Sequence, residues 1–218
     1  FRIKTERPKH FKFTAGEFTM IGFPEEKVKR AYSMTSGPYD DFIEFYSIKV
    51  PNGPLTSKLK HIEPGKMLYV GEKSTGTLTL AHLKLGGNLW LMATGTGIAP
   101  FISLLRDPGT YDAFDNITVT WTVPYKKDLR AYDEFLKDAD ITYFPTVTRE
   151  EFKNQGRITK YIESGMWDNI TPENDKIMIC GSMAFNTSMK EILLQKGYSE
   201  GNKRSEGSFT LEKAFVGD

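Results

Sequence analysis

Residues 88–107, NLWLMATGTGIAPFISLLRD, decide the fold that this sequence predicts. The apolar run at 89–93 is typical of a short strand buried on both faces. Residues 94–97 then turn the chain, and Pro100 stands where a helix should start, because its fixed φ suits that position and its missing N–H is not needed there. The apolar residues that follow predict a helix that ends at 107–109.

This strand, turn and helix together predict an anion site. Small residues let a phosphate approach backbone N–H groups at the positive end of the helix. The candidate ligands of a nucleotide diphosphate are Thr94, Gly95, Thr96 and Gly97. The pattern differs from the dinucleotide fingerprint GxGxxG, because Pro100 replaces its third glycine, and it lacks the Gly-Lys-Ser/Thr of a P-loop. A tight turn that only needs small residues is the alternative interpretation.

Composition limits the classes of protein. A chain of 218 residues can form one large domain or two modest ones. Its 29 basic and 28 acidic residues are balanced and no basic run contains interleaved aromatics, which argues against nucleic acid and membranes as partners. The single cysteine, Cys180, rules out an internal disulfide and a cysteine-ligated iron–sulfur cluster within this chain, and the histidines lack ligand spacing, so we expect no metal. With no membrane-spanning run and no signal peptide, the sequence predicts a cytoplasmic protein.

The pattern of elements changes once along the chain. The first part alternates as short strands do and contains one helix, which predicts a small antiparallel β-barrel. The second part alternates strands with helices, which predicts a Rossmann-like parallel sheet covered on both faces. The change lies at 81–87, so we predict a barrel domain at 1–84 and an α/β domain at 85–218. The expected strands are 11–13, 18–22, 42–50, 67–70, 77–80, 89–93, 117–121, 141–147 and 177–180, and the expected helices are 55–59, 100–106, 129–137, 158–163 and 184–196.

Two stretches of the barrel half predict a second ligand site. Arg30, Tyr32 and Ser33 bring a cation, a ring and a hydroxyl to one strand, whose alternate positions point the same way, so these groups suit a ring-bearing diphosphate. An exposed sheet face is the alternative. Further on, Gly53 precedes a helix start with hydroxyl side chains at 56–57, which is a second candidate anion site. Two candidate diphosphate sites in one chain are what a protein that pairs two dinucleotides requires.

Seven motifs in order carry a resemblance to a known family. They are RAYSMTS at 30–36, EFYSIKVPNGPLTSKL at 44–59, ATGTGIAPF at 93–101, TVTRE at 146–150, GRIT at 156–159, IMICGSM at 177–183 and EKAFV at 212–216. The chain resembles the bacterial type of ferredoxin (flavodoxin)–NADP reductase over nearly its whole length. The resemblance implies an FAD-binding barrel followed by an NADP-binding α/β domain. Hydride would pass from NADPH to the flavin, and single electrons from the flavin to a ferredoxin or flavodoxin.

The resemblance also implies roles for individual residues. The flavin would be held by Arg30, by Tyr32 stacked on its isoalloxazine, and by Ser33 near its N5. Its ribityl and pyrophosphate groups would be lined by Ile48, Val50, Gly53, Leu55 and Thr56. The NADP pyrophosphate would be bound by Thr94, Gly95, Thr96 and Gly97, and the nicotinamide approached by Cys180 and Gly181. The tail would cross the flavin with Ala214 and Phe215, the latter a stacking candidate.

A preference for NADP over NAD has support of its own in the sequence. An NAD site usually has Asp or Glu at the end of the next strand, whereas residues 121–123 here, Trp-Thr-Val, include no carboxylate. Arg149 and Arg157 follow the strand after that, and two guanidinium groups can clamp a 2′-phosphate. Ordinary surface arginines are the alternative, and the resemblance favours the clamp.

Departures from the family suggest a pared-down enzyme. Trp121 and Thr122 stand where the family tends to have a smaller pair, so we expect the indole to crowd or reshape the NADP side. Regions 138–143 and 165–172 look shorter than usual. Residues 185–188 lack a basic phosphate ligand that some relatives carry, so discrimination against NAD is expected to be weaker.

Three functional interpretations are carried forward. The first is the reductase, expected as a monomer that binds its ferredoxin or flavodoxin transiently. The second is a free flavin reductase or an oxygenase reductase component, and the third is a non-catalytic flavin-binding module. Cys180 is expected to position the nicotinamide rather than to act as a nucleophile, because no histidine is placed to activate it. Candidate basic residues for an acidic partner are Lys4, Arg7, Lys9, Lys12, Lys203 and Arg204.

Overall fold

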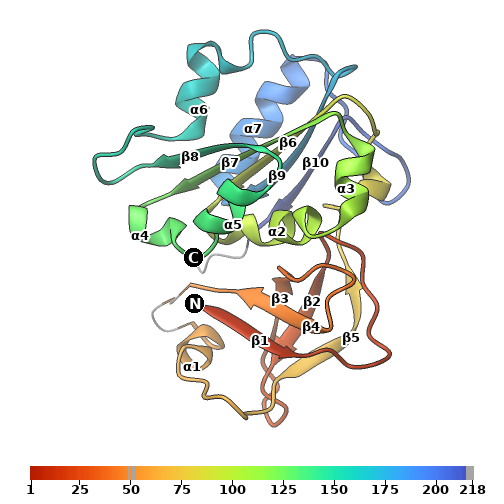
Figure 1. Cartoon of the computed structure of the whole chain (residues 1–218), viewed down its shortest axis with the longest axis vertical. Helices are drawn as coiled ribbons and strands as arrows, with labels where there is room; N and C mark the ends of the chain where they lie inside the picture. Colours follow the sequence, from red (N-terminus) through yellow and green to blue (C-terminus); the bar gives the residue numbers. More distant parts are fainter. Residues whose placement is uncertain (49, 51–52, 215–218) are drawn as a thin grey trace.

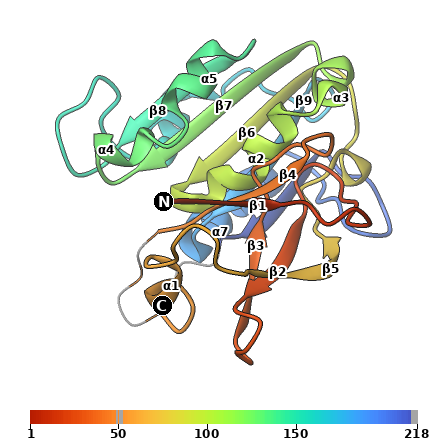
Figure 2. The ribbon, with the colours of Figure 1, turned by 60° about the horizontal axis from the view of Figure 1, so that its bottom comes forward.

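The computed structural model describes residues 1–48, 50 and 53–214. The N-terminal strands, red to orange in Figure 1, lie beneath a larger sheet with its helices, green to blue. Figure 2 shows the same two halves turned, with β6 beside β7. Both the antiparallel half and the parallel α/β half confirm the predicted fold class.

The N-terminal half is built from two small antiparallel sheets. Their orders are β1-β4 and β3-β2-β5, and an isolated bridge between Met34 and Phe45 connects them. Ile21, Ile43 and Phe45 are fully buried between the sheets, which explains their alternating apolar pattern. The elements are β1 (Arg2–Glu6), β2 (Phe18–Gly22), β3 (Lys29–Ser33), β4 (Phe42–Tyr46), α1 (Thr56–Leu59) and β5 (Tyr69–Thr75).

Three strand predictions in this half differ from the structure. The stretch 11–13 is a loop whose Phe11 and Phe13 are buried, so the alternation reflects burial without strand pairing. The strands predicted at 67–70 and 77–80 are replaced by the single strand β5. Thr77 cannot continue a ladder with its N–H, because the carboxylate of Glu212 accepts that hydrogen bond.

The C-terminal half is a five-stranded parallel sheet of order β10-β9-β6-β7-β8. The chain runs from β6 outward through β7 to β8, and then returns to β9 and β10 on the other side. The order therefore reverses between β6 and β9, which is where open α/β sheets bind ligands. Leu89, Leu91 and Met92 are fully buried, as predicted for a central strand. The strands are β6 (Asn88–Thr94), β7 (Asn116–Val123), β8 (Thr142–Val147), β9 (Asp175–Gly181) and β10 (Phe209–Lys213).

The helices of this half differ from the prediction in three places. The long helix expected at 129–137 is two short ones, separated at the buried Tyr132. The helix after the glycine turn ends as predicted, but a new one starts at Pro108, capped by the Asp107 side chain. The helix at 158–163 gives way after Tyr161 to an irregular turn, Ile162–Met166. The helices are α2 (Ala99–Leu105), α3 (Pro108–Ala113), α4 (Lys126–Leu129), α5 (Asp133–Asp138), α6 (Ile158–Tyr161) and α7 (Met183–Gln195).

One hydrophobic core joins the two halves. Tyr46, Leu78 and Leu83 from the first half pack in the same buried cluster as Phe101 and Leu104 of α2. The relative position of the halves is therefore fixed by packing as well as by the chain connection. Among the described residues, no helix is long and apolar enough to cross a membrane.

Candidate active site

A cavity of about 1100 Å³ lies between the barrel half and the C-terminal ends of β6 and β9. Residues of both halves line the cavity, and those of the C-terminal half include Glu212 and Lys213 of β10. Of the residues predicted for the site, those that line it are Arg30, Tyr32, Ser33, Ile48, Val50, Gly53, Leu55, Thr56, Thr96, Cys180 and Ala214. The structure thus brings most of the predicted flavin residues together with one residue of the predicted nucleotide loop.

The strand β3 supplies the ring, the hydroxyl and the cation. Arg30 and Tyr32 are two positions apart and share one face, while Ser33 is the last residue of the strand, where the alternation ends. The Tyr32 hydroxyl lies 3.2 Å from the Ser47 oxygen, and its ring meets Phe45 edge-on at 6.3 Å. Burial raises the pKa of Tyr32, so the phenol stays protonated at neutral pH. Tyr32 thus presents a neutral, flat ring to the cavity, and its contacts with Ser47 and Phe45 hold that ring in place.

A tight loop before α1 forms a second wall. The Gly53 N–H and the Thr56 hydroxyl both donate to the carbonyl of Val50, at 3.2 and 3.4 Å. A Cβ on Gly53 would lie only 2.2 Å from the Thr56 oxygen. A side chain at position 53 would force the Thr56 hydroxyl away from the Val50 carbonyl, so glycine suits this close approach.

The glycine turn after β6 touches the end of β9. A Cβ on Gly97 would lie 2.1 Å from the carbonyl oxygen of Cys180, and one on Gly181 would lie 2.2 Å from the Thr94 hydroxyl oxygen. The same Thr94 oxygen accepts a hydrogen bond of 3.2 Å from the Ser182 N–H. Glycines therefore allow the turn after β6 and the C-terminal end of β9 to lie in close contact, at the point where the strand order reverses.

The cavity wall also contains a carboxyl group, Glu212, that no sequence pattern predicts. Glu212 lies opposite Cys180 in the register of β10 and β9. Its Oε1 accepts hydrogen bonds from the N–H and the hydroxyl of Thr77. Burial raises the pKa of Glu212, while the Thr77 hydrogen bonds oppose that shift. The only signal in the sequence was its place as the first residue of the motif EKAFV.

Cys180 is buried at the same wall. Burial raises the pKa of its thiol strongly, and the Glu212 carboxylate raises it further. The thiol therefore stays protonated, which agrees with a positioning role and not with a nucleophile. Among the described residues, no group of three potential metal ligands is found.

Comparisons with known proteins agree with this geometry. Residues 91–191 match the family model described as an oxidoreductase NAD-binding domain. Ferredoxin–NADP reductase A of Sorangium cellulosum is 41% identical over 100% of this chain and 86% of its own length. The flavodoxin/ferredoxin–NADP reductase of Rhodobacter capsulatus is also 41% identical, over 100% of this chain and 88% of its own length. The chain belongs to the ferredoxin–NADP reductase family.

A solved member of the ferredoxin–NADP reductase family has the same fold. The ferredoxin NADP⁺ reductase of Neisseria gonorrhoeae, crystallised with bound FAD and NADP, superposes with a TM-score of 0.91 and 27% identity, covering 98% of this chain and 92% of that one. The alignments with the two relatives run over 238 and 239 residues, more than the 218 of this chain. Both relatives therefore carry segments that this member of the family lacks.

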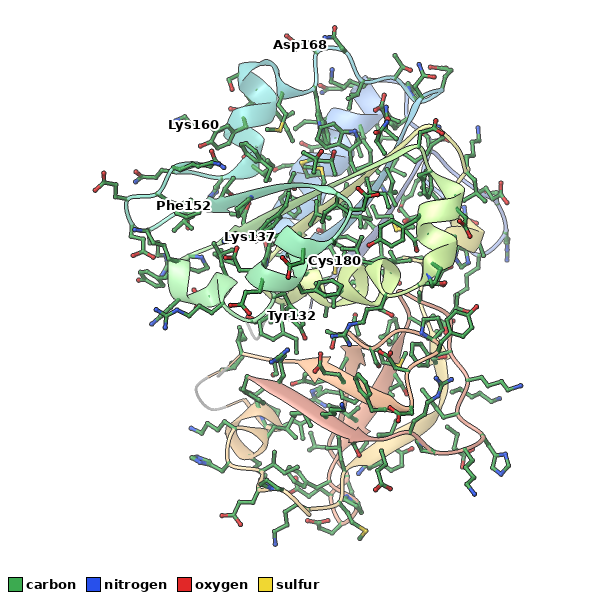
Figure 3. The ribbon with its side chains drawn as sticks, in the orientation of Figure 1. Tyr132, Lys137, Phe152, Lys160, Asp168 and Cys180 are labelled. Carbon is green, nitrogen blue, oxygen red and sulfur yellow. The ribbon has the colours of Figure 1, made fainter. Side chains whose placement is uncertain are left out.

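The two predicted 2′-phosphate ligands lie away from the cavity. Arg149 and Arg157 are exposed at the two ends of the loop between β8 and α6, and neither forms an ion pair within the part of the chain that the structure describes. The loop folds back through a 2.8 Å hydrogen bond from the Gly156 N–H to the Val147 carbonyl. Figure 3 shows Phe152, a residue of this loop, well to one side of Cys180.

Of the predicted tail and basic residues, Ala214 and Lys203 lie at the cavity. The Ala214 N–H donates to the Gly181 carbonyl at 2.9 Å, which places the start of the tail beside β9, whereas Phe215 lies outside the described residues. Lys203 lines the cavity and donates to the Thr75 hydroxyl at 3.1 Å. Arg7 instead donates to three backbone carbonyls of the barrel half, so its role is structural.

Proposed function

We propose that this protein is an FAD-dependent reductase that transfers electrons between NADPH and a ferredoxin or flavodoxin. When bound, FAD accepts two electrons as a hydride from NADPH and releases them one at a time to the protein partner. The observation that carries the proposal is the single cavity in which Tyr32 of the barrel and Thr96 of the nucleotide loop both form walls. Relatives named for this reaction cover the whole chain.

The residues present fit FAD. The volume of about 1100 Å³ is at the upper end of ligand pockets, as a dinucleotide requires. A flat neutral ring at Tyr32 suits the isoalloxazine, and Arg30 at the same face suits the diphosphate. Gly53 and Thr56 both line the cavity just before and at the start of α1, where small polar residues let a phosphate approach.

The chain's own groups orient the reactants and control protons at the wall. Tyr32 and Ser33 fix the ring from the barrel side, and Cys180 at the end of β9 limits how closely the nicotinamide approaches. Burial raises the pKa of Glu212 beside Cys180, so this carboxyl group takes up a proton more readily than an exposed one does. These roles are positional and electrostatic rather than covalent.

We assign the NADP preference to Arg149 and Arg157. Both are exposed at one loop beyond the C-terminal end of β8, on the edge of the sheet where the adenosine end of a dinucleotide extends. The Arg149 N–H donates to the Pro124 carbonyl at 3.0 Å, which ties this loop to the end of β7. No carboxylate ends β7, so nothing there favours the free 2′-hydroxyl of NAD.

We also propose that 1–84 form the FAD domain and 85–218 the NADP domain, since the parallel sheet begins at Asn88. From the sequence alone, we further propose that the protein is a monomer and that it is located in the cytoplasm. Light scattering of the FAD-loaded protein tests the monomer.

Anaerobic reduction of the bound flavin tests the function. NADPH should bleach the visible flavin spectrum quickly and NADH slowly, and the reduced protein should then reduce a ferredoxin or flavodoxin. Preference for free flavin over either protein acceptor would favour the free flavin reductase. A bound flavin that neither nucleotide bleaches would favour the non-catalytic module, and failure to bind FAD at all would overturn the barrel assignment.

A further inference from the structure

The indole of Trp121 contacts the nucleotide loop from inside the protein. We expected this bulky residue of β7 to crowd or reshape the NADP side, but its side chain is fully buried beneath the turn. Its Nε1–H donates a hydrogen bond of 2.8 Å to the carbonyl oxygen of Gly95. On its other side, the indole meets the ring of Tyr46 edge-on at 6.5 Å, and Tyr46 lines the cavity. Trp121 thus lies between the loop and the cavity wall.

This hydrogen bond fixes the direction of one peptide plane. The peptide between Gly95 and Thr96 is trans, so its C=O and N–H point in opposite directions. With the carbonyl held by the buried indole, the Thr96 N–H is turned away from the core. Thr96 is at the start of a helical turn, where N–H groups have no partner within the turn, and it lines the cavity.

The loop alone does not impose this direction. Gly95 has a φ of +54° and carries no Cβ, so no side chain of its own restricts the direction of the peptide that follows. The hydrogen bond from Trp121 Nε1–H to the Gly95 carbonyl sets the direction of the peptide. From these contacts we propose that Trp121 is a positioning residue for pyrophosphate binding: it holds the Gly95–Thr96 peptide so that the Thr96 N–H faces the pyrophosphate of NADP(H). The inference rests on the proposed function.

The chain offers a matched control in Trp90. This tryptophan also belongs to the parallel sheet, donates one Nε1–H hydrogen bond, of 3.2 Å to Asp175 Oδ1, and packs edge-on against an aromatic ring. It lies near the opposite end of β6, away from the glycine turn. Trp→Phe at both positions removes a donor and some volume, but only Trp121→Phe removes the donor to the loop.

The test compares two ligands by titration calorimetry of the FAD-loaded protein. NADP⁺ contains the pyrophosphate, whereas 2′-AMP contains only the 2′-phosphate end. Trp121→Phe should weaken NADP⁺ binding by about threefold to tenfold, the range that one hydrogen bond supplies, and leave 2′-AMP binding unchanged. Trp90→Phe should leave both unchanged. Unchanged NADP⁺ binding by Trp121→Phe, or equal weakening of both ligands, would overturn the positioning role.

Further outcomes separate this inference from the function it rests on. A wild-type protein that holds FAD but does not bind NADP⁺ would overturn the proposed function and this role together, whereas unchanged binding in Trp121→Phe overturns the role alone. If Trp121→Phe does not retain FAD, Trp121→Met replaces it, because methionine also lacks the Nε1–H donor to Gly95 and adapts its shape to fill a buried space. That variant should show the same loss for NADP⁺ only, and wild-type NADP⁺ binding would contradict the role.

Discussion

At the scale of single residues, Glu212 couples the chemistry of the cavity to the stability of the fold. Its carboxyl group sits beside Cys180 and is bound by Thr77 from the other half of the chain. Burial favours its protonated form in the folded protein, so the folded state binds this proton more tightly than the unfolded chain does. The stabilising contribution is therefore full below the ordinary pKa of 4.5 and is lost as the pH rises through the raised value.

Glu212→Gln should consequently be more stable than the wild type near neutral pH, because glutamine keeps the acceptor oxygen without the charge. The difference in Tm should shrink as the pH falls toward 4, where the wild-type carboxyl is protonated in both states. Thermal unfolding followed by circular dichroism across pH 4–8 checks this, with the exposed Glu191→Gln as control. A Tm difference that does not depend on pH would contradict the assignment.

Gly97 shows how little room one residue has at the site. A methyl group there would lie 2.1 Å from the Cys180 carbonyl oxygen, and neither backbone can yield without separating β6 from β9. Gly97→Ala should cost about 1–3 kcal/mol or more of unfolding free energy, as overpacking does, and should weaken NADP⁺ binding. Urea denaturation measures the cost. Gly109→Ala in α3, where the nearest atom is 3.4 Å away, should unfold like the wild type.

At the scale of elements, predictions from the sequence succeeded where local rules set the structure. The strand, glycine turn and helix start around β6 form as expected, because burial, glycine and Pro100 all act within a few residues. The strand predicted at 77–80 failed because a residue 135 positions away takes the Thr77 N–H. The helix predicted at 129–137 failed because Tyr132 is bound to Glu44 in the other half. Such long-range contacts leave no periodic pattern in the sequence.

Local motifs likewise determine which site residues can be predicted from the sequence. Most of the predicted flavin residues share one cavity, because each belongs to a motif that fixes its own turn or strand. Glu212 was missed because one acidic residue in a strand has no local signature. The directional role of Trp121 was likewise invisible, since only the fold brings its indole beneath Gly95.

The loop between β8 and α6 should decide which nucleotide the enzyme prefers. If Arg149 binds the 2′-phosphate as we propose, Arg149→Ala removes a charge-assisted contact, so kcat/KM for NADPH should fall by about tenfold while that for NADH stays the same. Steady-state kinetics with both nucleotides measures this. Lys153→Ala, an exposed charge of the same loop, should change neither value. An equal fall for both nucleotides would place Arg149 outside the 2′-phosphate site.

At the scale of the whole molecule, polar contacts reinforce the shared hydrophobic core between the halves. The Ser103 hydroxyl of α2 donates to the Ser36 carbonyl at 2.7 Å, with both residues fully buried. The Tyr132 hydroxyl donates to Glu44 Oε1 at 3.0 Å, and Arg106 lies 3.5 Å from the same carboxylate oxygen. Figure 3 shows Tyr132 at the boundary between the halves. A rigid boundary keeps the walls of the cavity at a fixed separation.

Tyr132→Phe should therefore lower the unfolding free energy by about 1–2 kcal/mol, because it removes a donor from a buried carboxylate. Tyr111→Phe serves as control, since that hydroxyl donates to the Leu105 carbonyl at a partly exposed position. Tyr111→Phe should lower the unfolding free energy by less than Tyr132→Phe does. Chemical denaturation of both variants, each loaded with FAD, provides the comparison, and equal costs would show that the Glu44 contact does not stabilise the boundary.

The strand β10 is the last strand in chain order among the described residues, yet it supplies Glu212 and Lys213 to the cavity, and Ala214 directly after it lines the cavity too. Proteins are synthesised from the N-terminus, and domains fold in that order as they leave the ribosome. The barrel strands and most of the parallel sheet are thus translated before this wall exists. A nascent chain can fold its barrel strands early, but this wall of the cavity cannot form until translation has passed residue 214, so the cavity closes only after both halves have been synthesised.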